Sequence, residues 1–223
     1  MQKDASTLPV FSIIMASRLA PYQGAASNRE RKIIRAINSA LNQSFSNLEL
    51  IVVADGCKKT LELIEDYYFL DQEPRLKVFS VEHVGLWSGH VRNTGIEKAK
   101  GQWIVYLDID DMLGRNHLQI IKAGINSKPA ETKWFYFNDY LANPKIKSDE
   151  GIVFQERYCD IDKIGKNGTS NICHLRKLET RWEHYGNYKH DWNFIRALYY
   201  QQPREFIPTP EYCVCHYPNT VDV

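Results

Sequence analysis

Residues 102–111 read QWIVYLDIDD, an apolar run that ends in three carboxylates. The run from Trp103 to Leu107 has the length and the aromatic and β-branched content of a buried strand. Carboxylates at the end of a buried strand are costly unless a partner offsets their charge. This stretch therefore predicts a buried strand that carries acidic side chains to a ligand site.

The segments around this strand alternate between strand and helix patterns. We predict strands over residues 10–16, 48–54, 75–81 and 102–108, and helices over residues 29–43, 58–70, 86–101 and 115–127. Because the strands are almost continuously apolar, the pattern favours an α/β fold with a mostly parallel central sheet flanked by helices on both faces.

The second half of the chain has a weaker pattern. We expect a strand over 132–142, an extended edge over 151–158, a loop over 161–171, a helix over 189–201 and a period-two strand over 211–217. Residues 1–223 are interpreted as one domain, in which residues 114–223 elaborate the sheet built by residues 1–113.

Polar side chains follow each of the first four predicted strands. Ligands of parallel α/β sheets bind outside the carboxyl ends of the strands, so we expect these side chains to share one site. They are Ser17 and Arg18, Asp55 and Gly56, Glu82 and His83, and Asp108 and Asp110.

Asp108 and Asp110 can point to the same side if the strand continues through them. Two adjacent carboxylates repel each other unless a cation offsets their charge. Mg²⁺ and Mn²⁺ suit such a pair, since they keep few protein ligands and complete their coordination with water and phosphate oxygens. We expect a metal ion on Asp108 and Asp110 that bridges to a diphosphate. The alternative is a solvated turn whose acids cap the next helix.

Composition excludes several classes of protein. The net charge is +1, which does not favour nucleic-acid binding. The five cysteines are scattered without a CxxC pair, which argues against zinc and a disulfide framework and favours the reducing cytoplasm. The N-terminal apolar stretch is too short to span a bilayer, so no transmembrane segment is expected, while contact with the inner membrane surface stays open. The sequence does not indicate an oligomeric state.

At this point the chain resembles the family 2 glycosyltransferases of the GT-A fold. The likeness runs from about Val10 to Leu113 and resumes around residues 165–198. It is carried, in order, by VFSIIMAS (10–17), NQSFSNLELIVVADG (42–56), HVRNTGIEKAKGQWIVYLDIDD (90–111) and HDWNFIRAL (190–198).

The resemblance implies a Rossmann-like GT-A sheet and an inverting transfer of a sugar from a nucleotide diphosphate sugar, with a UDP-sugar expected, to a hydroxyl of a glycan or other acceptor. It also implies a role in surface polysaccharide or glycan synthesis. Residues 1–113 would then bind the nucleotide sugar, and residues 114–223 would form the acceptor side.

The same resemblance implies a role for individual residues. Asp55 would contact the nucleobase, and Ala16, Ser17 and Arg18 would border it. Arg92 and Asn93 would lie beside the nucleotide. Asp108 would lie near the ribose or the metal, and Asp110 would be the principal ligand of Mn²⁺ or Mg²⁺. Asp191 would be the catalytic base.

Further expectations concern the loops and the acceptor. Residues 17–28 or 161–171 are candidates for a loop that closes over the donor. Trp182, Tyr185 and Trp192 could form an acceptor platform, although aromatic residues beside helices usually belong to the core. His216 could join the metal, but an ordinary histidine is the simpler interpretation.

The chain also departs from the family pattern. The loop over 17–28 is long, which leaves uridine preference open. Cys57 stands where serine is common, and His190 precedes Asp191 where glutamate is common. Three other interpretations compete: a nucleotidyltransferase, although SRLAPYQGAAS is a poor phosphate loop; an aspartyl phosphatase, although Met112 replaces its expected Thr or Val; and a non-catalytic nucleotide-sugar-binding domain.

Overall fold

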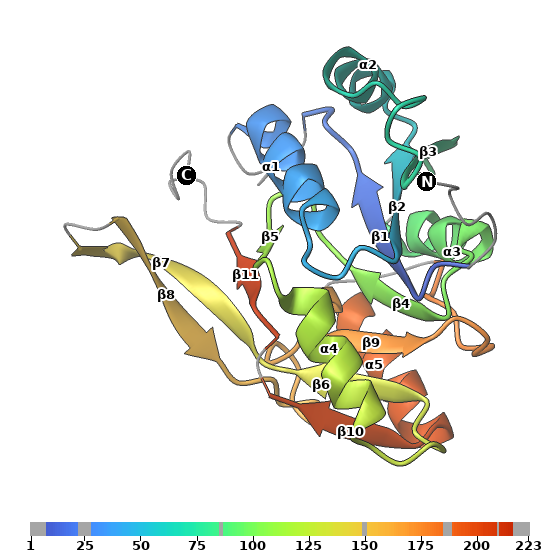
Figure 1. Cartoon of the computed structure of the whole chain (residues 1–223), viewed down its shortest axis with the longest axis vertical. Helices are drawn as coiled ribbons and strands as arrows, with labels where there is room; N and C mark the ends of the chain where they lie inside the picture. The colour runs from blue at the N-terminus through green and yellow to red at the C-terminus, as the bar shows by residue number, and fades with distance from the viewer. Residues whose placement is uncertain are drawn as a thin grey trace, which may run out of the picture.

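The computed structural model describes residues 8–21, 28–84, 87–148, 151–184, 189–208 and 210–215. Within these residues, seven strands form the main sheet, in the order β10-β6-β9-β4-β1-β2-β3 (Figure 1). Only β9 runs against its neighbours. The strands are β1 (Phe11–Ser17), β2 (Leu48–Asp55), β3 (Leu76–Val81), β4 (Trp103–Tyr106), β6 (Trp134–Phe137), β9 (Ile172–Leu175) and β10 (Arg204–Ile207).

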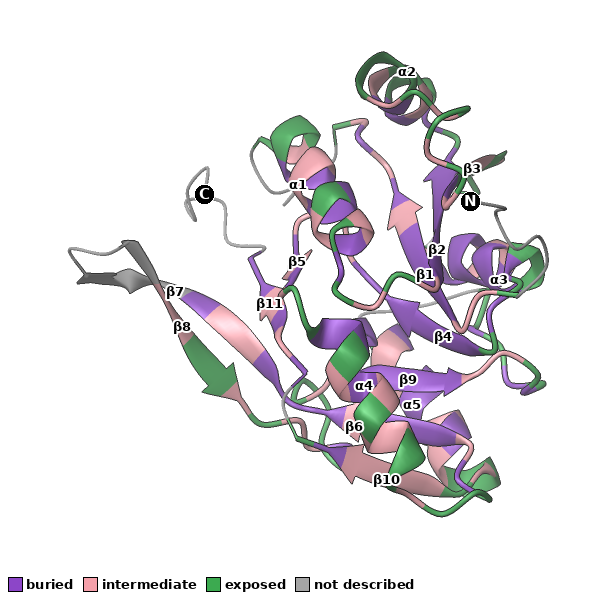
Figure 2. Cartoon of the chain, in the orientation of Figure 1, coloured by how far each residue is buried: buried purple, intermediate pink, exposed green. Residues whose placement is uncertain are grey.

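Five α-helices of the described chain cover both faces of this sheet. They are α1 (Arg29–Leu41), α2 (Lys58–Tyr67), α3 (Gly89–Lys98), α4 (His117–Asn126) and α5 (His190–Gln201). One apolar cluster joins α1, α2 and α4 to one face, and a second joins α3 and α5 to the other. The inner strands β1, β2, β4 and β9 are buried along most of their length, whereas the edge strands β3 and β10 are mostly of intermediate exposure (Figure 2). The predicted mostly parallel α/β sheet is thus confirmed.

A second sheet of the described residues has the order β5-β11-β7-β8. It contains β5 (Met112–Leu113), β7 (Asp139–Ser148), β8 (Gly151–Arg157) and β11 (Tyr212–Val214). The predicted edge over 151–158 is β8, and the strand predicted over 132–142 is split between β6 and β7. In the described ranges, no helix combines the length and apolar character that crossing a bilayer requires.

Two local details position the site. Gly95 lets α3 approach β1, because a Cβ there would lie 2.5 Å from Ile14 Cγ2. Gly56 follows β2 at a φ of 54°, in the left-handed region that favours glycine, and a Cβ there would meet His83. The two glycines thus set how closely α3 and the end of β3 approach the edge where the acids gather.

Candidate active site

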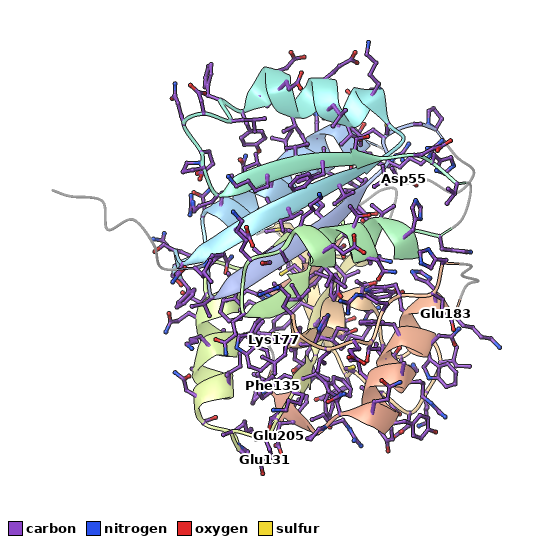
Figure 3. The ribbon with its side chains drawn as sticks, turned by 90° about the vertical axis from the view of Figure 1, so that its right-hand side faces the viewer. Asp55, Glu131, Phe135, Lys177, Glu183 and Glu205 are labelled. Carbon is purple, nitrogen blue, oxygen red and sulfur yellow. The ribbon has the colours of Figure 1, made fainter. Side chains whose placement is uncertain are left out.

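A pocket of about 690 Å³ opens at the carboxyl ends of β1, β2 and β4. Figure 3 marks this edge by the label of Asp55 at the end of β2. Residues from both halves of the chain line it: Ala16, Ser17, Arg18, Pro21, Arg29, Asp55, His83, Trp87, Ser88, Arg92, Asp108, Ile109, Asp110, His190 and Asp191. The structure therefore brings together all the residues to which the family resemblance gave a role in binding or catalysis, except Asn93. Gly56 and Glu82, which were expected at the same edge of the sheet, do not line the pocket.

Asp55 forms one end of the pocket. Its carboxylate is buried, and Oδ2 lies 3.0 Å from His83 Nδ1. Oδ1 has no hydrogen-bond partner in the described part of the chain, and His90 Nε2 lies 3.5 Å from it. Arg18 donates a hydrogen bond to the backbone carbonyl of Asp55 at 2.9 Å. This end of the pocket thus carries a buried carboxylate whose two oxygens lie against histidines.

Side chains of α1 and α2 hold Ser17 and Arg18 in place. The Ser17 hydroxyl lies 3.1 Å from that of Thr60 on α2. Arg29, at the start of α1, donates to the backbone carbonyls of Arg18 and Leu19. These bonds fix the first turn after β1, while residues 22–27 of the loop predicted to close lie outside the described residues.

The acids that follow β4 lie on a turn and not on the strand. β4 ends at Tyr106, and the backbone N–H of Asp111 donates to the carbonyl of Asp108 at 3.1 Å. The strand alternation that we used to place Asp108 and Asp110 on one side is therefore wrong, yet both line the pocket. The turn, and not strand alternation, brings both side chains to the pocket.

Asp111 has a different role from its neighbours. It is buried, and it accepts hydrogen bonds from the Cys215 backbone N–H at 2.7 Å and the Tyr212 hydroxyl at 3.1 Å. Burial, with the charges of Asp110 and Asp108, raises the pKa of Asp111 well above its usual range. Asp111 therefore holds β11 against the turn formed by residues 108–111, which we call the acidic turn. It does not begin a helix.

The acidic turn has the donor set of a hard divalent cation. The side chain of Asp108 is 40% exposed, and it faces the pocket with Asp110. Within the described ranges no group of three or more His, Cys, Asp or Glu side chains gathers to hold a metal. Two pocket-facing carboxylates fit an ion such as Mg²⁺ or Mn²⁺, which takes its other ligands from substrate and water. His216 lies outside the described residues.

Arg92 joins the acidic turn to the start of α5. Its guanidinium is buried and donates to Asp108 Oδ1 at 3.1 Å. On the other side, Nη1 lies 2.9 Å from His190 Nε2 and 3.9 Å from Asp191 Oδ1. Arg92 also lies over the ring of Trp182, 4.7 Å from its centroid. One cation thus sets the relative positions of acids that are 83 residues apart in the sequence.

Asp191 lies in the first turn of α5 and faces the pocket. Its Oδ1 accepts a 2.6 Å hydrogen bond from Thr169 and lies 3.0 Å from His190 Nε2. Burial opposes ionisation, but the bonds from His190 and Thr169 and the charge of Arg92 outweigh it and lower the pKa of Asp191. Asp191 is therefore an anion at neutral pH and can accept a proton.

Asn93 and Trp182 serve the packing of the site. Both ends of the Asn93 amide bind the backbone of Trp182, each at 2.9 Å, so the structure does not bring Asn93 into the pocket. Trp182 is 1% exposed and stacks on Phe194. A side chain this buried cannot carry an acceptor, so Trp182 is not part of an acceptor platform. Trp192 is half-buried on α5, and Tyr185 lies outside the described residues.

Sequence reasoning missed three residues that surround Asp191 at its end of the pocket. Trp87 lines the pocket and packs against His190, with ring centroids 5.3 Å apart. His190 was noted only as a departure from a pattern, and Thr169 lies in a segment that we predicted as loop. At the Asp55 end of the pocket, the sequence did give a signal, because His83 follows a predicted strand and was expected at this edge of the sheet.

Comparisons with known proteins agree with this arrangement. Residues 25–132 match the family model "Glycosyl transferase family 2". An uncharacterized glycosyltransferase of Haemophilus influenzae is 34% identical over 113 residues, which are 50% of this chain and 40% of that protein. Chondroitin synthase of Escherichia coli is 34% identical over 89 residues, which are 40% of this chain and 12% of that protein. The chain thus spans less than half the length of either relative.

Solved structures extend the likeness to most of the fold. Residues 1–349 of Staphylococcus aureus TarS superpose with a TM-score of 0.67 at 19% identity, covering 92% of this chain and 60% of that one. A mannosyltransferase from Pyrobaculum calidifontis superposes with a TM-score of 0.61 at 13% identity, covering 94% and 58%. Residues 25–132 thus match the sequence of glycosyl transferase family 2, and the fold over 92% of the chain is similar to that of TarS.

Proposed function

We propose that the protein is an inverting glycosyltransferase that moves a sugar from a nucleotide diphosphate sugar to an acceptor hydroxyl. The observation that carries this proposal is the Arg92 bridge, whose guanidinium lies between Asp108 of the acidic turn and Asp191 of α5 in one pocket. A diphosphate at the acidic turn and a base at α5 are the two groups that a displacement at a sugar carbon needs.

The nucleotide occupies the part of the pocket between Asp55 and Asp108 in this proposal. The Asp55 carboxylate would contact the base, and Ala16, Ser17 and Arg18 would border it. UDP is the expected nucleotide, and it is supported by the TarS structures solved with UDP and with UDP-GlcNAc. Residues 1–113 would then be the donor half and residues 114–223 the acceptor half.

The reaction is a single displacement at the anomeric carbon. The acceptor oxygen attacks this carbon while Asp191 takes the hydroxyl proton, and the bond to the diphosphate oxygen breaks with its electron pair on the leaving group. Attack from the side opposite the leaving group inverts the anomeric centre. Thr169 and His190 hold the Asp191 carboxylate, and Arg92 keeps it ionised.

Asp108 and Asp110 are the residues that would hold Mn²⁺ or Mg²⁺. The ion would supply charge that stabilises the departing diphosphate. This assignment is supported by the two half-buried carboxylates that line the pocket and by GalNAc-T7, solved with UDP, GalNAc and Mn²⁺.

The acceptor and the setting are proposed at a coarser level. A glycan hydroxyl in polysaccharide synthesis is supported by the likeness to chondroitin synthase. A cytoplasmic location fits the five cysteines, which are all described and are all free thiols.

Thermal unfolding with nucleotides tests the donor site. The protein is heated with UDP, GDP, dTDP or CMP, each with and without Mn²⁺. A ligand at one hundred times its Kd stabilises the fold by about 2.7 kcal/mol, which raises the Tm measurably. We expect one nucleoside diphosphate to raise the Tm in the presence of Mn²⁺. If none of them shifts the Tm at millimolar concentration, the proposed donor site is wrong.

A further inference from the structure

Trp87 is an exposed indole in a pocket that is otherwise polar at this end. Its side chain is 46% exposed, and it belongs to neither apolar cluster of the core. The residues beside it at this end are Ser88, Arg92, His190 and Asp191. Single exposed aromatic side chains are common on protein surfaces, but this one lines the pocket, where a bound ligand would cover its apolar surface.

The contacts of Trp87 place it at the reacting end of the pocket. Its ring packs against that of His190, with centroids 5.3 Å apart and planes tilted by 30°. His190 in turn lies 3.0 Å from Asp191 Oδ1 and 2.9 Å from Arg92 Nη1. The contacts of Asp55, at the other end, are with His83, His90 and Arg18. A nucleobase held at Asp55 is therefore served by a different set of side chains.

His190 makes the indole a fixed surface. The imidazole is itself enclosed by Trp182, whose ring centroid lies 5.9 Å away, and it is buried. Trp87 thus rests against a buried, hydrogen-bonded ring. A pyranose has one face made mainly of C–H groups, which packs on an aromatic face while its hydroxyls reach nearby polar groups.

We propose that Trp87 is the platform on which the sugar of the donor stacks, so that it positions the anomeric carbon between the acidic turn and Asp191. This inference rests on the proposed function, because it needs a nucleotide sugar in the pocket. Trp87 is a specificity residue in this role, since it contacts one face of the sugar and does not take part in proton transfer.

The test compares nucleotide sugars with the nucleotides alone. Isothermal titration with Mn²⁺ measures the Kd of UDP, UDP-GlcNAc, UDP-glucose, UDP-galactose, GDP and GDP-mannose for the wild-type protein, Trp87→Ala and Trp87→Phe. Phe69→Ala is the matched control, because Phe69 is 74% exposed and does not line the pocket. Far-UV circular dichroism and the Tm establish that each variant is folded.

We expect Trp87→Ala to weaken the preferred nucleotide sugar about three- to tenfold and to leave the matching nucleoside diphosphate within about twofold. Trp87→Phe keeps an aromatic face and falls between, and Phe69→Ala behaves as wild type. An equal loss for nucleotide and nucleotide sugar would overturn the inference, since Trp87 would then contact the nucleotide. Unchanged binding of the nucleotide sugar overturns it as well. If the wild-type protein binds none of the six, the proposed function itself fails.

Discussion

At the scale of single residues, the site depends on carboxylates in three distinct environments. Asp55 is buried beside two histidines, Asp108 is exposed and paired with Arg92, and Asp191 is held by Thr169 and His190. Each environment suits one task, which is to accept an N–H, to share a cation or to take a proton. In the proposed function, the same residue type thus serves different chemistry because its neighbours differ.

Replacing Asp110 tests the metal assignment. Asp110→Asn removes one charge from the acidic turn with little change in size, so Mn²⁺ should lose most of its contribution to nucleotide binding. We expect the Tm shift with nucleoside diphosphate and Mn²⁺ to disappear in Asp110→Asn, while the shift without Mn²⁺ stays as in the wild type. Asp162→Asn is a control on an exposed loop. A full Mn²⁺-dependent shift in Asp110→Asn would refute the assignment.

At the scale of elements, β11 supports the acidic turn from below. The Tyr212 hydroxyl accepts the Asp108 backbone N–H and donates to Asp111 Oδ2, both at 3.1 Å. Cys215 donates its backbone N–H to Asp111 Oδ1. A three-residue strand near the end of the described chain thus holds a turn that lies a hundred residues earlier.

Tyr212→Phe measures the value of this support. The change leaves the Asp108 N–H and Asp111 Oδ2 without their buried partner, which costs about 1–3 kcal/mol in the free energy of unfolding. Urea unfolding of the variant gives this loss directly, and Tyr67→Phe on the exposed end of α2 is the control. Equal stability of Tyr212→Phe and the wild type would mean that β11 does not hold the turn.

The sequence predicts the elements of the first half because its strands are long apolar runs and its helices repeat apolar residues at helical spacing. It does not predict β9 or β10, because four residues such as Ile172–Leu175 give too short a pattern. β9 finds its place by pairing with β4 and β6, which no local signal encodes. Asn28 has a side chain that is common at N-caps, yet it has a φ of 53° and makes no side-chain cap bond to α1.

The same limit applies to the site. The pocket positions of Asp55, Asp108 and Asp110 follow from the rule that strands of a parallel sheet share one edge. Trp87, His190 and Thr169 come together through packing between α3, α5 and the turn before β9, so their contacts cannot be inferred from spacing. Asn93 shows the converse, because its place in a motif did not reveal that its amide binds the backbone of Trp182.

At the scale of the whole molecule, two buried histidines make the fold sensitive to acid. Burial lowers the pKa of both His117 and His174 from the usual 6.5 to about 4. His174 lies 2.8 Å from the Tyr106 hydroxyl, and His117 lies 2.5 Å from the Pro210 carbonyl oxygen. Both rings are neutral in the fold, whereas in the unfolded chain each takes up a proton near pH 6.5.

The contribution of these histidines is therefore complete above pH 6.5 and is lost as the pH falls toward 4. At pH 5 each should lower the free energy of unfolding by about 2 kcal/mol relative to neutral pH. Urea unfolding at pH 7 and pH 5 measures the difference, and His117→Gln should reduce it by about half of the histidine share. The readout is the dependence on pH and not the absolute stability. A variant with the full wild-type dependence would contradict the assignment to His117.

The most direct test of the proposed function is to measure turnover and binding together in Asp191→Asn. The nucleotide sugar that binds best to the wild-type protein is supplied with Mn²⁺ and a mixture of sugar acceptors, and the release of nucleoside diphosphate is followed. Removing a positioned base should lower the rate about 10²- to 10⁴-fold, while the Kd of the donor changes little. If Asp191→Asn turns over the donor at the wild-type rate, then Asp191 is not the base and the proposed mechanism is wrong.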